Sequence, residues 1–217
     1  MMRTFLHSFL LTLCGVVAAH AADSPSVPKP VPGPGPQALI EQVSQDMLRA
    51  LDANRATYRK NPDQLRALVD RYLLPNFDIE FAARRVLGKH WTTATPEQRK
   101  RFIDAFVGSL MGDYSEAILE FTADRLKLLP FRGDPAATSA TVRSLVKTSD
   151  GTEVPVNYTL RATPQGWKAW DLTVEGISYV RNFQNDFAAE INAQGLDHLI
   201  KRLEAQRGSH APAAKTG

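Results

Sequence analysis

The sequence predicts an α+β fold made of a helical block, four antiparallel strands and a closing helix. Three observations support this prediction. Apolar residues recur three or four positions apart through residues 37–121, which is the period of a helix face. They alternate at every second position through 126–175, as they do in half-buried strands. The helical period returns after Gly176, so helices are expected on one face of a curved sheet.

Four helices are expected in the helical block, and several of their ends carry capping residues. Pro62 stands at the first position of the second helix, where proline is favoured. Asp78 can cap the third helix, and Gly88 can end it. Thr95 and Gln98 have the spacing of a capping box at the start of the fourth and longest helix.

The strands are separated by short segments rich in turn-forming residues, which predicts an antiparallel meander. The expected strands are Leu126–Phe131, Ser139–Thr148, Val154–Thr163 and Trp167–Glu175.

The segment 167–203 joins the last strand to the closing helix. Trp170, Leu172 and Val174 alternate with polar residues, and the helical stripe that follows consists of Ile177, Val180, Phe183, Phe187 and Ile191. Gly176 lies between the two patterns, so we expect an L-shaped apolar wall with its corner at this glycine. Gly195 is expected to split the closing helix into two pieces.

The chain ends indicate export. Residues 1–22 have a positive Arg3, an apolar run and an Ala19-His20-Ala21 cleavage signal, which together predict a signal peptide. Residues 23–36 are a proline-rich spacer, 37–207 the folded domain and 208–217 a tail expected to be disordered. Leu13 before Cys14 argues against lipidation.

Composition excludes several classes of function. The formal charge is only +3 and the basic residues are scattered, so a nucleic-acid-binding surface is not expected. Cys14 is the only cysteine and lies in the leader, which removes thiol chemistry from the mature chain. The few histidines lack the spacing of metal ligands, so no metal site is expected.

Catalytic groups are weakly indicated. Ser178 follows Gly176 as in half of a hydrolase elbow motif, but the second glycine is missing and the downstream base could only be His198. Ser178 is more simply the cap of the closing helix. Asp171 and Glu175 share one face of the last strand and most simply face solvent. We therefore expect no catalytic residues and no enzymatic activity.

Three different functions would also fit the pattern of elements. A curved α+β sheet can hold an isomerase site made of a buried aspartate and a tyrosine, for which Tyr158 or Tyr179 is available. The second possible function is that of an esterase-like enzyme, and the third is that of a non-catalytic periplasmic adaptor. The more prominent feature is a surplus of inward-facing aromatic residues, which fits either a packed core or a cavity for an apolar ligand.

Two ordered blocks of residues resemble one family. The first is Trp170 to Phe183, followed by Phe187 and by Gly195 to Ile200. The second contains Phe77-Asp78, Ala82, Val86-Leu87-Gly88, Trp91, Thr95, Gln98, Phe102, Phe106, Leu110 and Tyr114. Together they are similar to the MlaC/toluene-tolerance family of periplasmic phospholipid carriers, from about Gln37 to Arg207. Phe183 departs from the tyrosine that is frequent at this place.

The resemblance implies a sheet with the cone shape of the nuclear-transport-factor-2 class, joined to a helical lobe around an apolar pocket. The cargo would be phospholipid, with no cofactor, and Arg84, Arg85, Lys89 or Arg143 would lie near its phosphate. The implied pocket lining is Phe77, Phe81, Val86, Trp91, Phe102, Phe106, Leu110, Tyr114, Val156, Tyr158, Leu160, Trp170, Leu172, Val174, Ile177, Val180 and Phe183.

The resemblance also implies a role and partners. A member of this family shuttles diacyl phospholipid through the periplasm and thereby maintains outer-membrane lipid asymmetry. The implied partners are an inner-membrane Mla ABC-transporter complex with a hexameric ring and an outer-membrane lipoprotein–porin complex. No chemical step is implied.

Overall fold

The computed structural model describes residues 31–134, 137–148 and 150–209, so the expected signal peptide and most of the spacer lie outside it. No helix among these residues is both long and apolar enough to cross a membrane. The helices are α1 (Pro36–Lys60), α2 (Pro62–Tyr72), α3 (Ile79–Leu87), α4 (His90–Thr93), α5 (Pro96–Leu119), α6 (Tyr179–Gln194) and α7 (Leu196–Ser209), with 3₁₀ turns at Leu74–Asn76 and Ala123–Arg125. Helix α7 therefore extends two residues into the expected tail, and α4 was not predicted.

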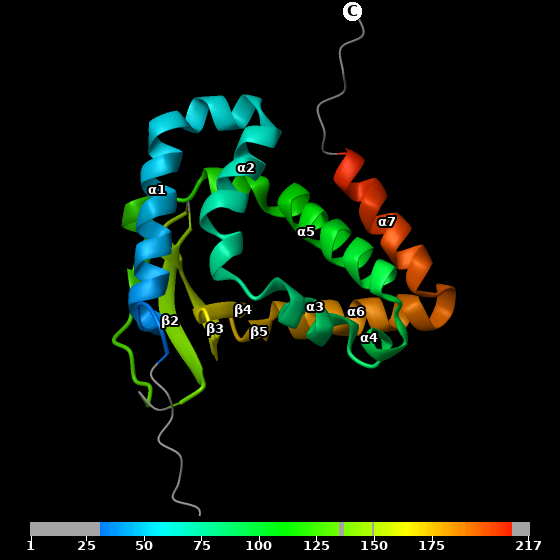
Figure 1. Cartoon of the computed structure of the whole chain (residues 1–217). Helices are drawn as coiled ribbons and strands as arrows, with labels where there is room; N and C mark the ends of the chain where they lie inside the picture. Colours follow the sequence, from blue (N-terminus) through cyan, green and yellow to red (C-terminus); the bar gives the residue numbers. More distant parts are fainter. Residues whose placement is uncertain (1–30, 135–136, 149, 210–217) are drawn as a thin grey trace, which may run out of the picture.

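A single antiparallel sheet holds all five strands in the order β1-β2-β3-β4-β5. The strands are β1 (Leu126–Leu128), β2 (Ser139–Lys147), β3 (Glu153–Thr163), β4 (Gly166–Val174) and β5 (Ile177–Ser178). The predicted meander and fold class are confirmed, but the predicted strand number was one too low. The N-terminal half of α1 packs on the sheet, and α3, α5, α6 and α7 form the other lobe in Figure 1.

A β-bulge in β4 changes which of its side chains share a face of the sheet. Thr159 of β3 pairs with Asp171 and Leu160 pairs with Ala169, so Trp170 is an extra residue in β4. Leu172 therefore shares the face of Ala169, while Asp171 lies on the opposite face. The prediction that Trp170 shares a face with Leu172 was wrong. Its indole instead packs edge-on against Phe81 of α3, with ring centroids 5.2 Å apart.

The corner between sheet and helix is a tight turn. Glu175 and Gly176 have φ values of +51° and +83°, as in the two-residue turns that join hairpin strands. The chain then forms β5, which pairs Ile177 with Val174, before α6 begins at Tyr179. Ile177 was predicted to begin the helical stripe, but it lies in a strand and is 61% exposed.

Asp171 is buried, contrary to the prediction that it faces solvent. Ser178 Oγ donates to Asp171 Oδ2 at 2.6 Å, and the Val180 N–H donates to Asp171 Oδ1 at 3.0 Å. Ser178 Oγ also accepts from the Arg181 N–H, so the predicted role of Ser178 as a helix cap is confirmed. The carboxylate of β4 thus holds the first turn of α6.

The other predicted caps are also present. Asp78 accepts from the Phe81 N–H at the start of α3, and Thr95 and Gln98 form both bonds of the capping box. Gly88 ends α3 with φ of +53°, and Gly195 separates α6 from α7 with φ of +86°. These helix boundaries follow from local signals that do not depend on the tertiary structure.

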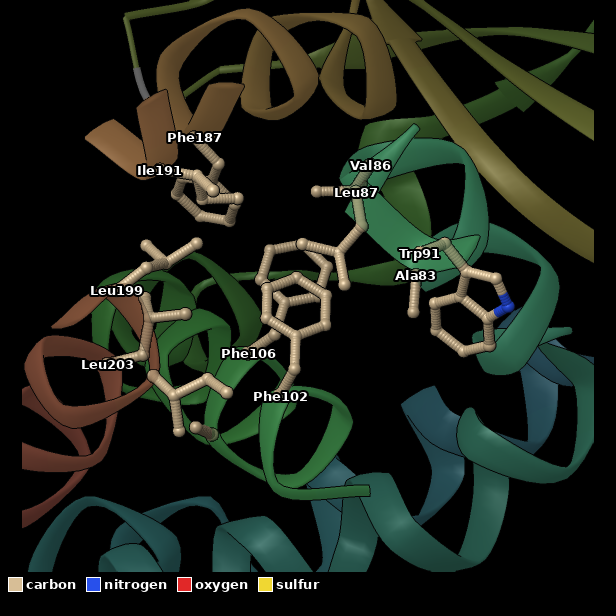
Figure 2. Packing of buried hydrophobic residues seen from close by; sticks show 12 residues of the cluster. Ala83, Val86, Leu87, Trp91, Phe102, Phe106, Phe187, Ile191, Leu199 and Leu203 are labelled. Carbon is tan, nitrogen blue, oxygen red and sulfur yellow. The ribbon is translucent and has the colours of Figure 1, made fainter. Parts of the chain in front are cut away.

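Three hydrophobic clusters make up the core. One lies between the sheet and α1 and contains Ile40, Val142 and Leu160. A second joins α1, α2 and the end of α5. The third joins α3, α5, α6 and α7, and Figure 2 shows its Phe102 and Phe106 between side chains of the other three helices. The helical lobe and the sheet therefore have separate apolar interiors.

An ion pair secures α7 to α6. The Arg202 guanidinium donates to both oxygens of Glu190, at distances from 2.7 to 3.0 Å, and His198 Nδ1 lies 3.2 Å from Glu190 Oε1. The bonds from Arg202 are the main reason why the pKa of Glu190 lies below its usual value, although burial of the carboxylate opposes this.

Replacing Asp171 by alanine should lower the free energy of unfolding by about 2 to 3 kcal/mol, because a buried charge-assisted cap is lost. Urea unfolding followed by circular dichroism measures the change. Asp186→Ala removes an exposed carboxylate from the same helix and should change stability by less than about 0.5 kcal/mol. Equal losses in the two variants would contradict this role of Asp171.

The α6–α7 ion pair should make stability depend on acid. A carboxyl whose pKa is lower in the folded state stabilises the fold above its unfolded pKa, and this contribution disappears as the pH falls through the folded pKa. Wild type should therefore lose about 1 kcal/mol more than Arg202→Met on acidification from about pH 5, the small size reflecting the partly exposed guanidinium. Urea unfolding at successive pH values tests this.

Methionine is chosen because Arg202 also lies over the Phe187 ring, at 5.8 Å from its centroid, and an unbranched chain keeps that contact. Adding Glu190→Gln to Arg202→Met should change the acid dependence little further. Parallel stability–pH curves for wild type and Arg202→Met would count against the pair.

Candidate functional site

The residues predicted to line a pocket fall into three groups. Five of them are buried in the hydrophobic clusters and serve as core: Val86, Trp91, Phe102, Phe106 and Leu160. Most of the rest are only partly buried and lie on the sheet or on the lobe formed by α5 and α6. The third group faces other surroundings: Phe81 of α3 and Trp170 of β4 pack against each other, and Ile177 of β5 is exposed.

The sheet contributes a partly exposed apolar strip. Its cross-strand rows follow from the register, since Tyr158 pairs with Leu172 and Val156 pairs with Val174. These four side chains share the face on which Leu160 and Ala169 are covered by α1, but they themselves are only half-buried. Phe77 extends this apolar surface, because it forms a bridge beside Ala169. We call Val156, Tyr158, Leu172 and Val174 the sheet strip.

The helical lobe contributes partly exposed aromatic and aliphatic groups. Leu110, Val180 and Phe183 pack against the α3–α5–α6–α7 cluster without being fully covered. Tyr114 and Tyr179 extend this surface, with ring centroids 5.7 Å apart. Tyr179 was predicted only as a possible acid–base group. Its ring, 6.1 Å from that of Phe183, is instead part of an aromatic row.

Polar groups on the sheet strip are neutral. Ser144 is fully buried and donates to the Val156 carbonyl at 2.7 Å, a role that sequence reasoning missed because the serine occupies an apolar alternation. Burial raises the pKa of Tyr158, and a hydrogen bond with Ser144 opposes the rise. The tyrosine therefore stays an uncharged phenol at neutral pH. Such a surface suits an apolar ligand and offers no acid–base pair.

The catalytic functions gain no support from the geometry. Ser178 Oγ donates to Asp171, and both carboxylate oxygens of Asp171 are used to hold α6. His198 bonds instead to Glu190 at the α6–α7 junction. Within residues 31–134, 137–148 and 150–209, no group of three or more histidine and acidic side chains could hold a metal ion.

Two adjoining hollows open on the outer side of α3 and α6. The first has a volume of about 630 Å³ and is lined by Arg84, Arg85, Gly88, Trp91, Thr92, Arg99 and Gln184. The second, of about 430 Å³, shares Arg85 and Gln184 with it and lies over Trp170 and Ile177. Of the basic residues expected near a phosphate, Arg84 and Arg85 come together here. Arg143 is exposed on the opposite sheet face from the strip.

The comparisons with known proteins agree on one family. Residues 41–205 match the family model described as MlaC protein. The toluene tolerance protein ttg2D of Pseudomonas putida is 30% identical over 179 residues, covering 82% of each chain. The intermembrane phospholipid transport system binding protein MlaC of Haemophilus influenzae is 22% identical, covering 78% of this chain and 80% of that protein.

A solved structure has the same fold. The phospholipid-binding protein of Ralstonia solanacearum, solved in complex with a phospholipid, matches with a TM-score of 0.75 and 27% identity. The match covers 81% of this chain and 98% of that one. These proteins are named for toluene tolerance, for intermembrane phospholipid transport and for phospholipid binding. With most of its length matched by the family model, the chain belongs to the MlaC family.

Proposed function

We propose that the protein is a periplasmic phospholipid carrier whose acyl-chain site lies between the sheet strip and the partly exposed side chains of α5 and α6. The observation that carries the proposal is this pair of half-covered apolar surfaces, on a fold shared with a protein solved with phospholipid. The proposed lining is Phe77, Leu110, Tyr114, Val156, Tyr158, Leu172, Val174, Val180 and Phe183.

Acyl chains fit the chemistry of this surface. Its polar atoms are neutral hydroxyls, and Ser144 already donates to a backbone carbonyl, so methylene groups would displace no strong hydrogen bond. Fully buried side chains such as Phe102 and Leu160 act as the support behind the site. Ile177, Phe81 and Trp170 are left out of the lining, because they face other surroundings.

Transport follows from the energetics of such a site. Burying one methylene contributes about 0.8 kcal/mol, so a chain of about sixteen carbons contributes on the order of 12 kcal/mol at most. Release into water would therefore be very slow, and the cargo must pass to another apolar site. We propose that these acceptors and donors are the inner-membrane Mla ABC-transporter complex and the outer-membrane lipoprotein–porin complex, so that lipid asymmetry is maintained.

Localisation is part of the proposal. The Ala19-His20-Ala21 signal after an apolar run supports export and cleavage, and the relative named for intermembrane phospholipid transport supports a role between two membranes. The proline-rich segment 23–36 would then separate the new N-terminus from α1.

Protein purified from a Gram-negative periplasm without detergent should contain diacyl phospholipid, detected by mass spectrometry of an organic extract. Leu172→Asp should lower the lipid-to-protein ratio at least about fivefold, because it places a charge on the sheet strip. Thr173→Asp adds the same charge on the opposite face and should keep the wild-type ratio. Both variants must retain the wild-type circular dichroism spectrum.

An empty wild-type protein would overturn the carrier proposal and favour an adaptor. Equal lipid loss in the two aspartate variants would show that the strip is not the binding surface. Because Leu172 and Thr173 are neighbours in β4, the two variants place the same charge in the same region of the fold but on opposite faces of the sheet.

Lipid-loaded protein should keep its cargo during prolonged dialysis against buffer and lose it when acceptor vesicles are present. The rate of loss should rise with vesicle concentration, because transfer requires contact with another apolar phase. Radiolabelled phospholipid on the protein measures this rate. A rate independent of vesicle concentration would indicate release through water and contradict the direct handover.

A further inference from the structure

The hollow outside α3 brings three arginines together. Arg84 and Arg85 come from the last turn of α3, and Arg99 comes from the first turns of α5. The remaining lining residues are Gly88, Trp91, Thr92 and Gln184, which carry no charge. The sequence separates Arg99 from the arginine pair by a turn and helix α4, so only the folded chain assembles this cluster.

Two tryptophan rings hold the guanidinium groups in position. The Arg84 and Arg99 guanidinium carbons lie 5.7 and 5.0 Å from the centroid of the Trp91 ring, and Arg99 Nε donates to the Trp91 carbonyl at 3.0 Å. Arg85 lies over the neighbouring Trp170 at 5.9 Å. Stacking on aromatic rings leaves the N–H edges of an arginine available to a ligand.

The charges in the hollow are not balanced by its lining. Glu80 approaches Arg84 to 3.6 Å but does not line this hollow; with Asp104 it lines a third hollow of about 300 Å³, which shares Trp91 and Arg99 with the first. Asp171 lines the adjoining hollow, where its oxygens are bonded to α6. Within the described part of the chain, neither Arg85 nor Arg99 forms an ion pair. Three like charges converging on one hollow favour a multivalent anion between them.

Gly88 allows the Gln184 amide to come close to the backbone at the edge of the hollow. A β-carbon at this position would meet Gln184 Nε2 at 2.8 Å, and the φ of +53° is itself one that glycine adopts most easily. Gln184 adds a neutral amide donor to the arginines, whereas the Thr92 hydroxyl already donates to the Lys89 carbonyl at 2.8 Å. A phosphate, with up to two charges and four oxygens, matches this set of donors better than a single carboxylate does.

We propose that the hollow lined by Arg84, Arg85 and Arg99 is a phosphate-binding site, separate from the acyl-chain site. Its phosphate can come from a phospholipid headgroup at a membrane surface or from a small soluble phosphate. The proposal does not depend on the carrier function, because the hollow lies on the outer side of α3 and shares no half-buried residue with the sheet strip.

The test uses the indole N–H signals of the chain's three tryptophans in ¹H–¹⁵N NMR spectra. Inorganic phosphate, added at constant ionic strength, should shift the Trp91 signal in a saturable way. Trp167 is buried beneath α1 and should not respond. Arg84→Gln combined with Arg85→Gln should weaken the fitted phosphate affinity by about tenfold or more, because two charge-assisted donors are lost.

The matched control is Arg59→Gln combined with Lys60→Gln. These exposed residues form an equivalent basic pair in the last turn of α1, away from the hollow, so the net charge changes equally. A role limited to favourable interaction with the helix dipole would lower stability in either pair without affecting phosphate binding. The control should keep the wild-type phosphate affinity within about twofold.

Two further measurements identify the source of the phosphate. Wild type that sediments with phosphatidylglycerol vesicles but not with phosphatidylcholine vesicles would indicate a lipid headgroup, provided that the Arg84/Arg85 variant no longer sediments with either. Phosphate titration without vesicle binding would indicate a soluble ligand. The lipid content of the Arg84/Arg85 variant, measured in parallel, should equal that of wild type.

Three results would overturn the proposal. They are an unsaturable Trp91 shift, equal weakening in both double variants, and binding of a hexaglutamate peptide in the absence of phosphate binding. The last result would assign the hollow to an acidic protein partner instead. Because lipid content is measured separately, failure of the phosphate site and failure of the carrier proposal give different outcomes.

Discussion

The buried carboxylate of Asp171 determines how the helical lobe meets the sheet. It belongs to β4 but bonds to Ser178 and to the Val180 N–H, so it fixes the first turn of α6 against the strand. The bulge at Trp170 lets Ala169 and Leu172 share one face of β4, while Asp171 lies on the other face. Because α6 carries Val180 and Phe183, this single polar contact sets the position of the helical side of the proposed acyl-chain site. With an apolar residue at position 171, packing alone would set the angle between β4 and α6.

Separate hydrophobic clusters explain how such a small protein can leave apolar surface for a ligand. The sheet is stabilised by α1, and α5 is stabilised by α3, α6 and α7, so neither depends on filling the region between them. A domain of this size usually has one contiguous core. Here Tyr158 and Leu172 on one side, and Phe183 on the other, lie at the borders of clusters that are already complete. Most of the apolar burial that stabilises the fold thus comes from these clusters, and less of it comes from the side chains that line the proposed acyl-chain site.

Local signals in the sequence predicted the fold well, and non-local ones were missed. The caps at Asp78 and Thr95 depend on residues three positions apart, which a sequence shows directly. The bulge depends on the register between two strands, and the run from Trp170 to Val174 hides it by alternating without interruption. Ile177 continues a helical spacing, yet the positive φ of Glu175, which no residue type announces, directs it into β5. The lining residues that prove to be core could not be separated from half-buried ones, because both are apolar.

Helix α3 has an apolar face and a charged face, so one chain could hold both proposed ligands without conflict. Its Ala83, Val86 and Leu87 face the cluster of Figure 2, while Arg84 and Arg85 face the outer hollow. A guanidinium beside acyl chains would lose its hydration, at a cost of several kcal/mol that would weaken lipid binding. Trp91 lies between the two environments, buried among apolar side chains and yet in contact with two guanidiniums. The amphipathic period of α3 therefore keeps charge out of the core behind the proposed acyl-chain site and places it at the surface.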